Sequence, residues 1–131
     1  MSPIKMHQIE SGIRLVVELY NSINNHKVED IIRLLCNDCV LESAYPAPHG
    51  NIYKGKEQIR KYYENLFKER KEVRFKTEEI LGFGHRCIIR WECIWVNRNG
   101  IEETTRGIDI IKEKNDLINE ILSYSKSSEI D

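Results

Sequence analysis

A carboxylate stands in the middle of an apolar stretch in the last quarter of the chain. Asp109 lies between Ile108 and Ile110 in the segment RGIDII. Burying a carboxylate among apolar side chains is unfavourable unless another group pairs with it or a reaction uses it. Asp109 is therefore the first candidate for acid–base chemistry, and a buried structural ion pair is the alternative.

Arg90 is the residue best placed to pair with Asp109. It lies in the segment RCIIRWECIWV, which the residues NRNG connect to the segment that carries Asp109. A tight hairpin turn at Asn99–Gly100 would place Arg90 directly opposite Asp109. Opposed side chains on neighbouring strands are close enough for an ion pair. We therefore expect Arg90 and Asp109 to be in contact.

Alternation along the strands then assigns the neighbouring side chains to two faces. Glu92 shares the face of Arg90 and Asp109, whereas Trp91 and Trp95 lie on the opposite face. Periodicity alone does not decide which face lines a pocket. The two tryptophans suit a dimer interface if their face is the outer one, and they would contact a ligand if it is the inner one.

Hydrophobic periodicity predicts helices in the first half of the chain and strands in the second. Apolar residues recur at helical spacing in three segments, which are residues 6–24, about 28–36, and 55–70. A period of two predicts strands in four later segments, which are residues 73–83, 86–96, 101–113 and 117–125. With an extended segment at 39–45, the order α-α-β-α-β-β-β-β predicts an α+β fold with helices on one face of an antiparallel sheet.

Size and charge exclude several classes of function. The chain has 131 residues, which suits a single domain over residues 1–131. The formal net charge of −1 provides no field that would attract nucleic acid or an anionic membrane surface. No apolar run is long enough to cross a bilayer, and the start of the chain, MSPIKMHQIESG, lacks the apolar core of a signal peptide. We expect a cytoplasmic protein that binds neither nucleic acid nor membrane.

The four cysteines do not form a convincing metal or redox motif. Cys36 and Cys39 have the CxxC spacing of such sites. A structural zinc site needs a second ligand pair at similar spacing, and Cys87 and Cys93 are six positions apart. Because disulfides are rare in the cytosol, we expect reduced thiols and no metal.

Three stretches of the chain, in order, carry a resemblance to a known family. They are LVVELYNSINNHKVEDIIRLLCNDCVLES, IYKGKEQIRKYYENLF and TTRGIDIIKEKNDLINEILSYSK. They resemble the opening helices and first strand, the third helix and the closing hairpin of the NTF2-like superfamily, in particular its SnoaL-like and ketosteroid-isomerase-like members. The resemblance covers roughly residues 8–126. It implies an NTF2-like cone, in which a strongly curved sheet wraps the helices and leaves a pocket, and a homodimer formed through the outer face of the sheet.

The resemblance also implies roles for individual residues. Asp109 matches an aspartate that donates to an oxyanion in ketosteroid isomerases and acts as the general base in SnoaL-type polyketide cyclases. Arg90, in the sequence RWE with Glu92, matches a pocket residue of limonene-epoxide-hydrolase-like members, which places this face inward. Tyr20 falls at the position of the oxyanion-binding tyrosine of the isomerases, and its alternative role is that of an ordinary core residue.

The chain departs from the complete catalytic sets of these relatives. Ser43, with Glu42 beside it, replaces the aspartate base of the isomerases, and Ser123 replaces the second aspartate of the epoxide hydrolases. His49, in the loop PAPHG, is either a ligand contact or a solvated loop residue. We predict ligand-binding roles for Glu42, Ser43, His49 and Ser123.

Two functions stay open at this point. The first is cofactor-independent acid–base chemistry on a small hydrophobic carbonyl compound, of the isomerase or polyketide-cyclase type and less favourably of the epoxide-hydrolase type. In it Asp109 moves a proton, and Arg90, Glu92 and Tyr20 complete the catalytic site. The alternative is a binding or accessory domain with a pocket and no turnover. Neither function requires a metal or an organic cofactor.

Overall fold

Three helices and six strands make up the part of the chain that the computed structural model describes, residues 3–126. The helices are α1 (Pro3–Asn24), α2 (Val28–Arg33) and α3 (Gly55–Glu69). The strands are β1 (Leu35–Glu42), β2 (Ile52–Lys54), β3 (Lys71–Phe83), β4 (Arg86–Val96), β5 (Glu102–Lys114) and β6 (Leu117–Ser125). No helix within this range is both long and apolar enough to cross a membrane.

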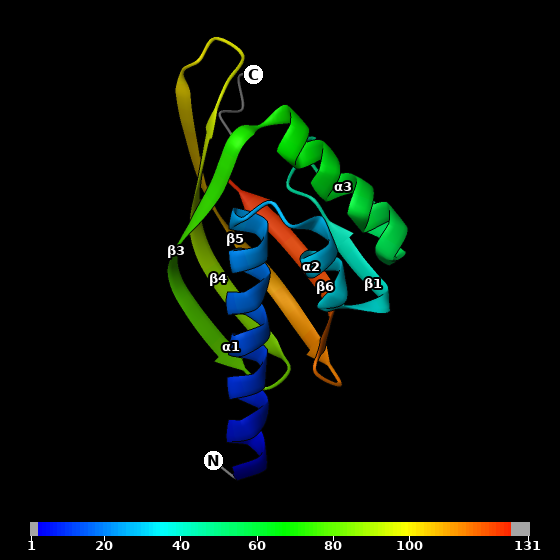
Figure 1. Ribbon diagram of the computed structural model, residues 1–131. Coiled ribbons are helices and arrows are strands. Elements are labelled where there is room, and N and C mark those ends of the chain that lie inside the picture. The colour runs from blue at the N-terminus through cyan, green and yellow to red at the C-terminus, as the bar shows by residue number, and fades with distance from the viewer. Residues whose placement is uncertain (1–2, 127–131) are drawn as a thin grey trace.

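All six strands form one curved sheet in the order β2-β1-β6-β5-β4-β3, with the helices on one side of it (Figure 1). Neighbouring strands run antiparallel except β1 and β6, which are parallel. The prediction of a purely antiparallel sheet is therefore wrong. Parallel neighbours need a long crossover connection, and everything between β1 and β6 serves as that connection.

The buried side of α1 carries the apolar residues that the helical spacing predicts. Val16, Leu19, Tyr20 and Ile23 are almost fully buried against the sheet. The end of the helix is fixed to β3, because the Asn24 side chain donates to the Phe75 carbonyl at 2.9 Å and accepts from its N–H at 2.7 Å. This attachment holds the position of Tyr20 one turn earlier.

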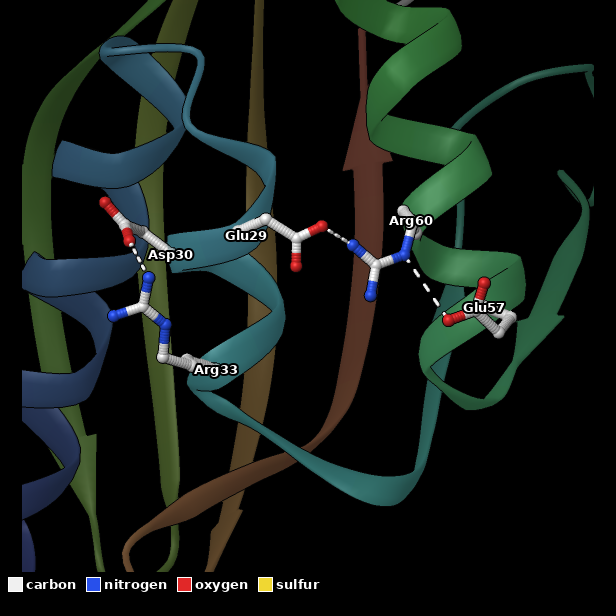
Figure 2. Close-up of polar contacts among 5 residues, drawn as sticks. All are labelled: Glu29, Asp30, Arg33, Glu57 and Arg60. Carbon is white, nitrogen blue, oxygen red and sulfur yellow. Dashed lines mark hydrogen bonds and ion pairs between the residues drawn. The ribbon is translucent and has the colours of Figure 1, made fainter.

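Helix α3 lies across β1 and is connected to α2 by charged side chains. Figure 2 shows Arg60 of α3 donating to Glu29 of α2, while Arg60 also contacts Glu57 within its own helix at 3.4 Å. The carboxylates of Glu29 and Glu57 are largely exposed, so these pairs add little stability. The side of α3 that faces the sheet carries its buried residues, Ile59 and Tyr63.

The largest differences from the predicted elements lie between the second helix and the third, where β1 covers Leu35–Glu42 in place of the predicted 39–45. The second helix ends at Arg33, and Leu35 already belongs to β1, where it pairs with Ile118 of β6. The apolar run around Leu35 fits either a helix or a strand, and pairing with β6 decides for the strand. Strand β2 was not predicted because it has only three residues, Ile52–Lys54.

The hairpin between β4 and β5 has a different loop from the predicted two-residue turn. The last ladder pair is Val96 with Glu102, and the Asn97 N–H donates to the Ile101 carbonyl at 2.9 Å. Three residues remain in the loop, of which Gly100 has a φ of +76°. The Asn97 side-chain oxygen also accepts two backbone N–H groups of the loop. A loop of three residues in place of two shifts the pairing between β4 and β5 by one residue.

The shifted register changes which side chains face inward. Arg90 lies opposite Ile108, and Asp109 lies opposite Ile89. Because a shift of one residue moves a side chain to the other face of a sheet, Arg90 and Glu92 lie on the face opposite to Asp109. The prediction that Arg90, Glu92 and Asp109 share the inner face is therefore wrong for Arg90 and Glu92.

Candidate functional site

Asp109 lies inside the fold and is held by two hydroxyl groups. Its side chain belongs to β5, and the residue is only 8% exposed. The Tyr20 hydroxyl, from α1, donates to Oδ2, and the Ser123 hydroxyl, from β6, donates to Oδ1 at 2.7 Å. Three elements that are distant in sequence thus converge on one carboxyl group.

The predicted ion pair of Asp109 is not formed. Arg90 lies on the outer face, where its guanidinium contacts Glu79 at 3.5 Å. Among the described residues, no basic side chain forms a salt bridge with Asp109. The structural ion-pair alternative for Asp109 is therefore wrong, and its burial is compensated by neutral donors.

Burial sets the acidity of this group. Loss of solvation raises the pKa of Asp109 above its ordinary value, and the hydrogen bonds from Tyr20 and Ser123 offset only part of that rise. Burial and the nearby Asp109 charge raise the pKa of Tyr20 well above its ordinary value, so its hydroxyl keeps its proton at neutral pH. Asp109 is thus a weaker acid, and its carboxylate a stronger base, than an exposed aspartate.

Trp91 places a free hydrogen-bond donor beside this carboxyl. The residue is 4% exposed, and its indole N–H has no partner within the described part of the chain. It is near enough to lower the pKa of Asp109, although their contact falls short of hydrogen-bond geometry. A buried donor without a partner is costly and suggests that a ligand or water completes it.

Gly107 makes room for the Trp91 ring. The two residues are paired across β4 and β5. A Cβ atom on Gly107 would lie 2.6 Å from Cη2 of Trp91 and 2.3 Å from the carbonyl oxygen of Tyr124. Gly107, two residues before Asp109 in the RGID segment, is therefore required by the position of the indole ring.

A small cavity adjoins Asp109. Its volume is about 50 Å³, which is space for roughly three or four water-sized groups. Six aromatic residues contribute to its wall: Tyr20, Tyr45, Tyr62, Tyr63, Phe75 and Trp91. The Phe75 ring meets those of Tyr20 and Trp91 edge to face, with centroids 5.8 and 5.0 Å apart. The cavity is thus apolar and holds a few polar groups around one carboxyl.

Among the predicted ligand-binding residues, only Ser123 lies in this cavity. Ser43 is buried, but its hydroxyl donates to the Tyr45 carbonyl at 2.5 Å and accepts the Asn51 N–H at 3.0 Å, so it secures the loop instead. Glu42 follows Leu41, which lines the cavity, and therefore points to the other side of the sheet. His49 is exposed and does not line the cavity. The predicted contacts of these three residues with a cavity ligand are not supported.

Sequence reasoning missed Trp91 as a cavity residue because of the register error. Tyr62 and Tyr63 lie in the segment 55–70, for which the sequence predicted a helix but no site. Gly107 was the available signal, since a glycine inside a strand often marks the close approach of another group. Within residues 10–126 no group of three or more His, Cys, Asp or Glu side chains could hold a metal ion, and the four cysteines are free.

Comparison of the sequence with protein families gives a match over residues 16–121 to the model described as "SnoaL-like domain". Comparison with curated proteins gives no significant match. Many solved structures are similar, among them an NTF2-like protein of unknown function from Mesorhizobium loti. That protein is 22% identical, with a TM-score of 0.79 over 92% of this chain and 94% of that chain.

Two further structures agree with this result. An NTF2-like protein of unknown function from Burkholderia pseudomallei is 15% identical, with a TM-score of 0.81 over 92% of this chain and 94% of that one. A putative SnoaL-like polyketide cyclase from a Jannaschia species is 12% identical, with a TM-score of 0.78 over 96% of this chain and 90% of that one. At these identities the likeness establishes the fold, and the predicted NTF2-like α+β fold is confirmed.

Proposed function

Since this chain belongs to the SnoaL-like domain family, we propose that its cavity takes up the carbonyl end of a small apolar molecule and that Asp109 transfers a proton on that molecule. One observation carries the proposal. Asp109 is a buried carboxyl whose pKa is raised, it has two hydroxyl donors, and it has no ion-pair partner among the described residues. A perturbed carboxyl in an apolar cavity is typical of acid–base sites.

In the proposed reaction, ionised Asp109 removes a proton from the carbon next to the carbonyl group. Its raised pKa makes the carboxylate a stronger base than that of an exposed aspartate. Tyr20 and Ser123 donate to its two oxygens and so fix its orientation. The proton then returns from Asp109 to another atom of the substrate, which is the isomerase or cyclase type of outcome.

Proton removal leaves negative charge on the carbonyl oxygen, and Trp91 is the group proposed to stabilise it. Its indole N–H is buried, free of other partners and close to Asp109. A donor that is already in place in a water-poor site stabilises such charge more strongly than water does. Trp91 thus takes the role that the sequence suggested for Arg90.

Hydrogen–deuterium exchange tests this proposal directly. The protein is incubated in D₂O with small ketones such as 4-methylacetophenone and cyclohexanone, and loss of the proton signals next to the carbonyl is followed by NMR. Asp109→Asn should slow exchange by about 10²–10⁴-fold, the usual contribution of a positioned proton-transfer group. Glu113→Gln is the matched control, because Glu113 is also buried but does not line the cavity. Equal exchange rates in Asp109→Asn and the wild type would refute proton transfer by Asp109.

Binding without turnover is the second candidate function. It is favoured by the composition of the cavity wall, in which Asp109 is the only carboxylic acid among the described residues. Isomerisation by two separate carboxyl groups is therefore not available in this cavity. Ketones that perturb the Trp91 indole signal but show no exchange above the rate in buffer would support this candidate.

We also propose that the chain forms a homodimer through the outer face of the sheet. Leu81, Ile88, Ile110 and Leu122 pair in turn across β3, β4, β5 and β6, which gives an apolar row on that face. Phe83 and Tyr124 are 56% and 50% exposed, and the register places them on the same face. An apolar surface of this kind on four adjacent strands suits a two-fold interface. The two tryptophans do not take part in this face, since Trp91 is buried inside and Trp95 lies on the same side of β4.

A further inference from the structure

Arg70 lies where the inner cavity meets a larger cleft. It follows the last residue of α3 and caps that helix through its backbone N–H. The outer cleft has a volume of about 810 Å³. Tyr45, Arg70 and Thr105 line both the inner cavity and the outer cleft. These residues therefore form the wall between the two spaces, and a ligand that enters the cavity from the cleft must pass them.

Two aromatic rings hold the Arg70 guanidinium at this position. Its central carbon lies 4.0 Å from the centroid of the Trp95 ring and 5.0 Å from that of Tyr45. Cation–π contacts of this length attract the guanidinium to the rings without using its N–H groups. The group is thus positioned while its hydrogen-bonding capacity stays available.

Arg70 has no strong acceptor in the described part of the chain. One of its N–H groups points to the Cys93 sulfur at 3.9 Å, which is a weak acceptor. Burial raises the pKa of the Cys93 thiol to about 11, so this thiol is neutral and provides no counter-charge. No carboxylate within residues 10–126 forms a salt bridge with Arg70. The guanidinium therefore keeps several free donors at the wall of the cavity.

The charges that line the inner cavity lie on two residues, Asp109 and Arg70. Asp109 already accepts from two hydroxyl groups, whereas Arg70 has no acidic partner. We propose that Arg70 binds the carboxylate of an apolar keto acid whose carbonyl group lies at Asp109 and Trp91. The placement of the carbonyl group depends on the proposed function. The placement of the carboxylate depends only on the contacts of Arg70.

A carboxylate is the anion that fits this site best. The planar guanidinium presents N–H groups in a fork that matches the two oxygens of a carboxylate. Among the described residues, the inner cavity has no second cation to balance the charge of nearly −2 on a phosphate monoester. Positive and negative side chains are equal in number in the outer cleft, which holds Arg70, Arg106, Lys126, Glu69, Glu92 and Glu103. The described residues of the cleft therefore carry no net formal charge that would repel an anion.

The two tryptophans of the chain report separately on the two ends of the proposed ligand. Trp91 adjoins Asp109, and Trp95 contacts Arg70. Their indole N–H signals can be followed by ¹H–¹⁵N NMR during titration with two probes of similar shape, 4-acetylbenzoate and 4-methylacetophenone. The first carries a carboxylate where the second carries a methyl group.

We expect 4-acetylbenzoate to shift both indole signals and to bind about 10- to 100-fold more tightly than 4-methylacetophenone, which is the range for hydrogen bonds to charged groups. Arg70→Gln should abolish this preference and leave the affinity for 4-methylacetophenone unchanged. Arg106→Gln is the matched control. Arg106 lines the same outer cleft but donates to both oxygens of Glu78, so its loss should leave the preference intact.

If Arg70→Gln does not fold, the test uses the salt dependence of binding to the wild type and the affinities of Arg70→Lys. Added salt should weaken binding of 4-acetylbenzoate but not of 4-methylacetophenone, and Arg70→Lys should retain only part of the preference because it keeps the charge and loses the fork. The carboxylate site is overturned if the wild type binds both probes equally well or responds to neither. It is also overturned if the preference for 4-acetylbenzoate survives in Arg70→Gln. A carboxylate-dependent shift of Trp95 without any shift of Trp91 supports the Arg70 site and contradicts the proposed function.

Discussion

Gly107→Ala should destabilise the protein through two close contacts. The added Cβ would lie 2.3 Å from the Tyr124 carbonyl oxygen and 2.6 Å from Cη2 of Trp91, both far inside normal contact distance. The first of these atoms is backbone in the neighbouring strand and cannot move alone. Overpacking of this kind costs about 1–3 kcal/mol in the free energy of unfolding. In a domain of this size, that corresponds to a fall in Tm of about 4–12 °C.

Gly12→Ala is the control for this change. It has the same effect on the unfolded chain, but its Cβ would meet only the Cys87 sulfur at 3.2 Å and the Glu113 side chain at 4.0 Å. Alanine is favoured over glycine in a helix, so this variant should be neutral or more stable than the wild type. Thermal melting followed by circular dichroism measures both variants.

A double-mutant cycle separates the two contacts of Gly107. Trp91→Phe removes the ring atoms nearest to the added Cβ, so Gly107→Ala should cost less in that background. The contact with the Tyr124 carbonyl remains, so part of the cost should persist. Equal Tm values for Gly107→Ala and Gly12→Ala, or the same cost of Gly107→Ala with and without Trp91→Phe, would refute the reasoning.

Three further predictions concern the site and the assembly. The pKa of Asp109 is raised in the folded state. Its protonated form therefore stabilises the fold fully below the ordinary pKa of 3.8, and this stabilisation is lost as the pH rises through the raised pKa. The free energy of unfolding of Asp109→Asn relative to the wild type should therefore increase with pH above this point, by at most about 1.4 kcal/mol per pH unit, and a difference that stays constant with pH would contradict it. Trp91→Phe should reduce ketone proton exchange by about 10²–10³-fold, as removal of an oxyanion donor does, with an unchanged rate counting against its role. Ile110→Lys should convert the proposed dimer to a monomer in sedimentation experiments, and a wild-type monomer at micromolar concentration would disprove the dimer.

The order of the helices and long strands was predictable because each of these segments is long and has a clear hydrophobic period. Residues 55–70 repeat at helical spacing, and residues 86–96 alternate as a strand does. The register of the β4–β5 hairpin was not predictable from the same pattern. Asn99–Gly100 is typical of a two-residue turn, whereas the Asn97 side chain stabilises a three-residue loop. One residue of difference there moves the β4 side chains to the opposite face relative to Asp109, so Trp91 points inward and Arg90 points outward.

The convergence of Tyr20 and Asp109 depended on tertiary structure. The two residues are 89 positions apart, and no local pattern connects them. The family resemblance suggested the position of Tyr20, while the core alternative remained open. In the structure Tyr20 is both buried in the core and bound to Asp109, so the two alternatives are not exclusive. Its role in proton transfer stays a prediction.

The parallel pairing of β1 with β6 affects the order in which the molecule can assemble. Helix α1 and strand β1 are synthesised early, but β6, which pairs with β1 and carries Ser123, is synthesised after all the other strands. Strand β1 therefore has only β2 beside it in the sheet until β6 has been synthesised. Asp109 acquires its Ser123 partner only when β6 joins β5, so the cost of removing the carboxyl from water falls on a late step of folding.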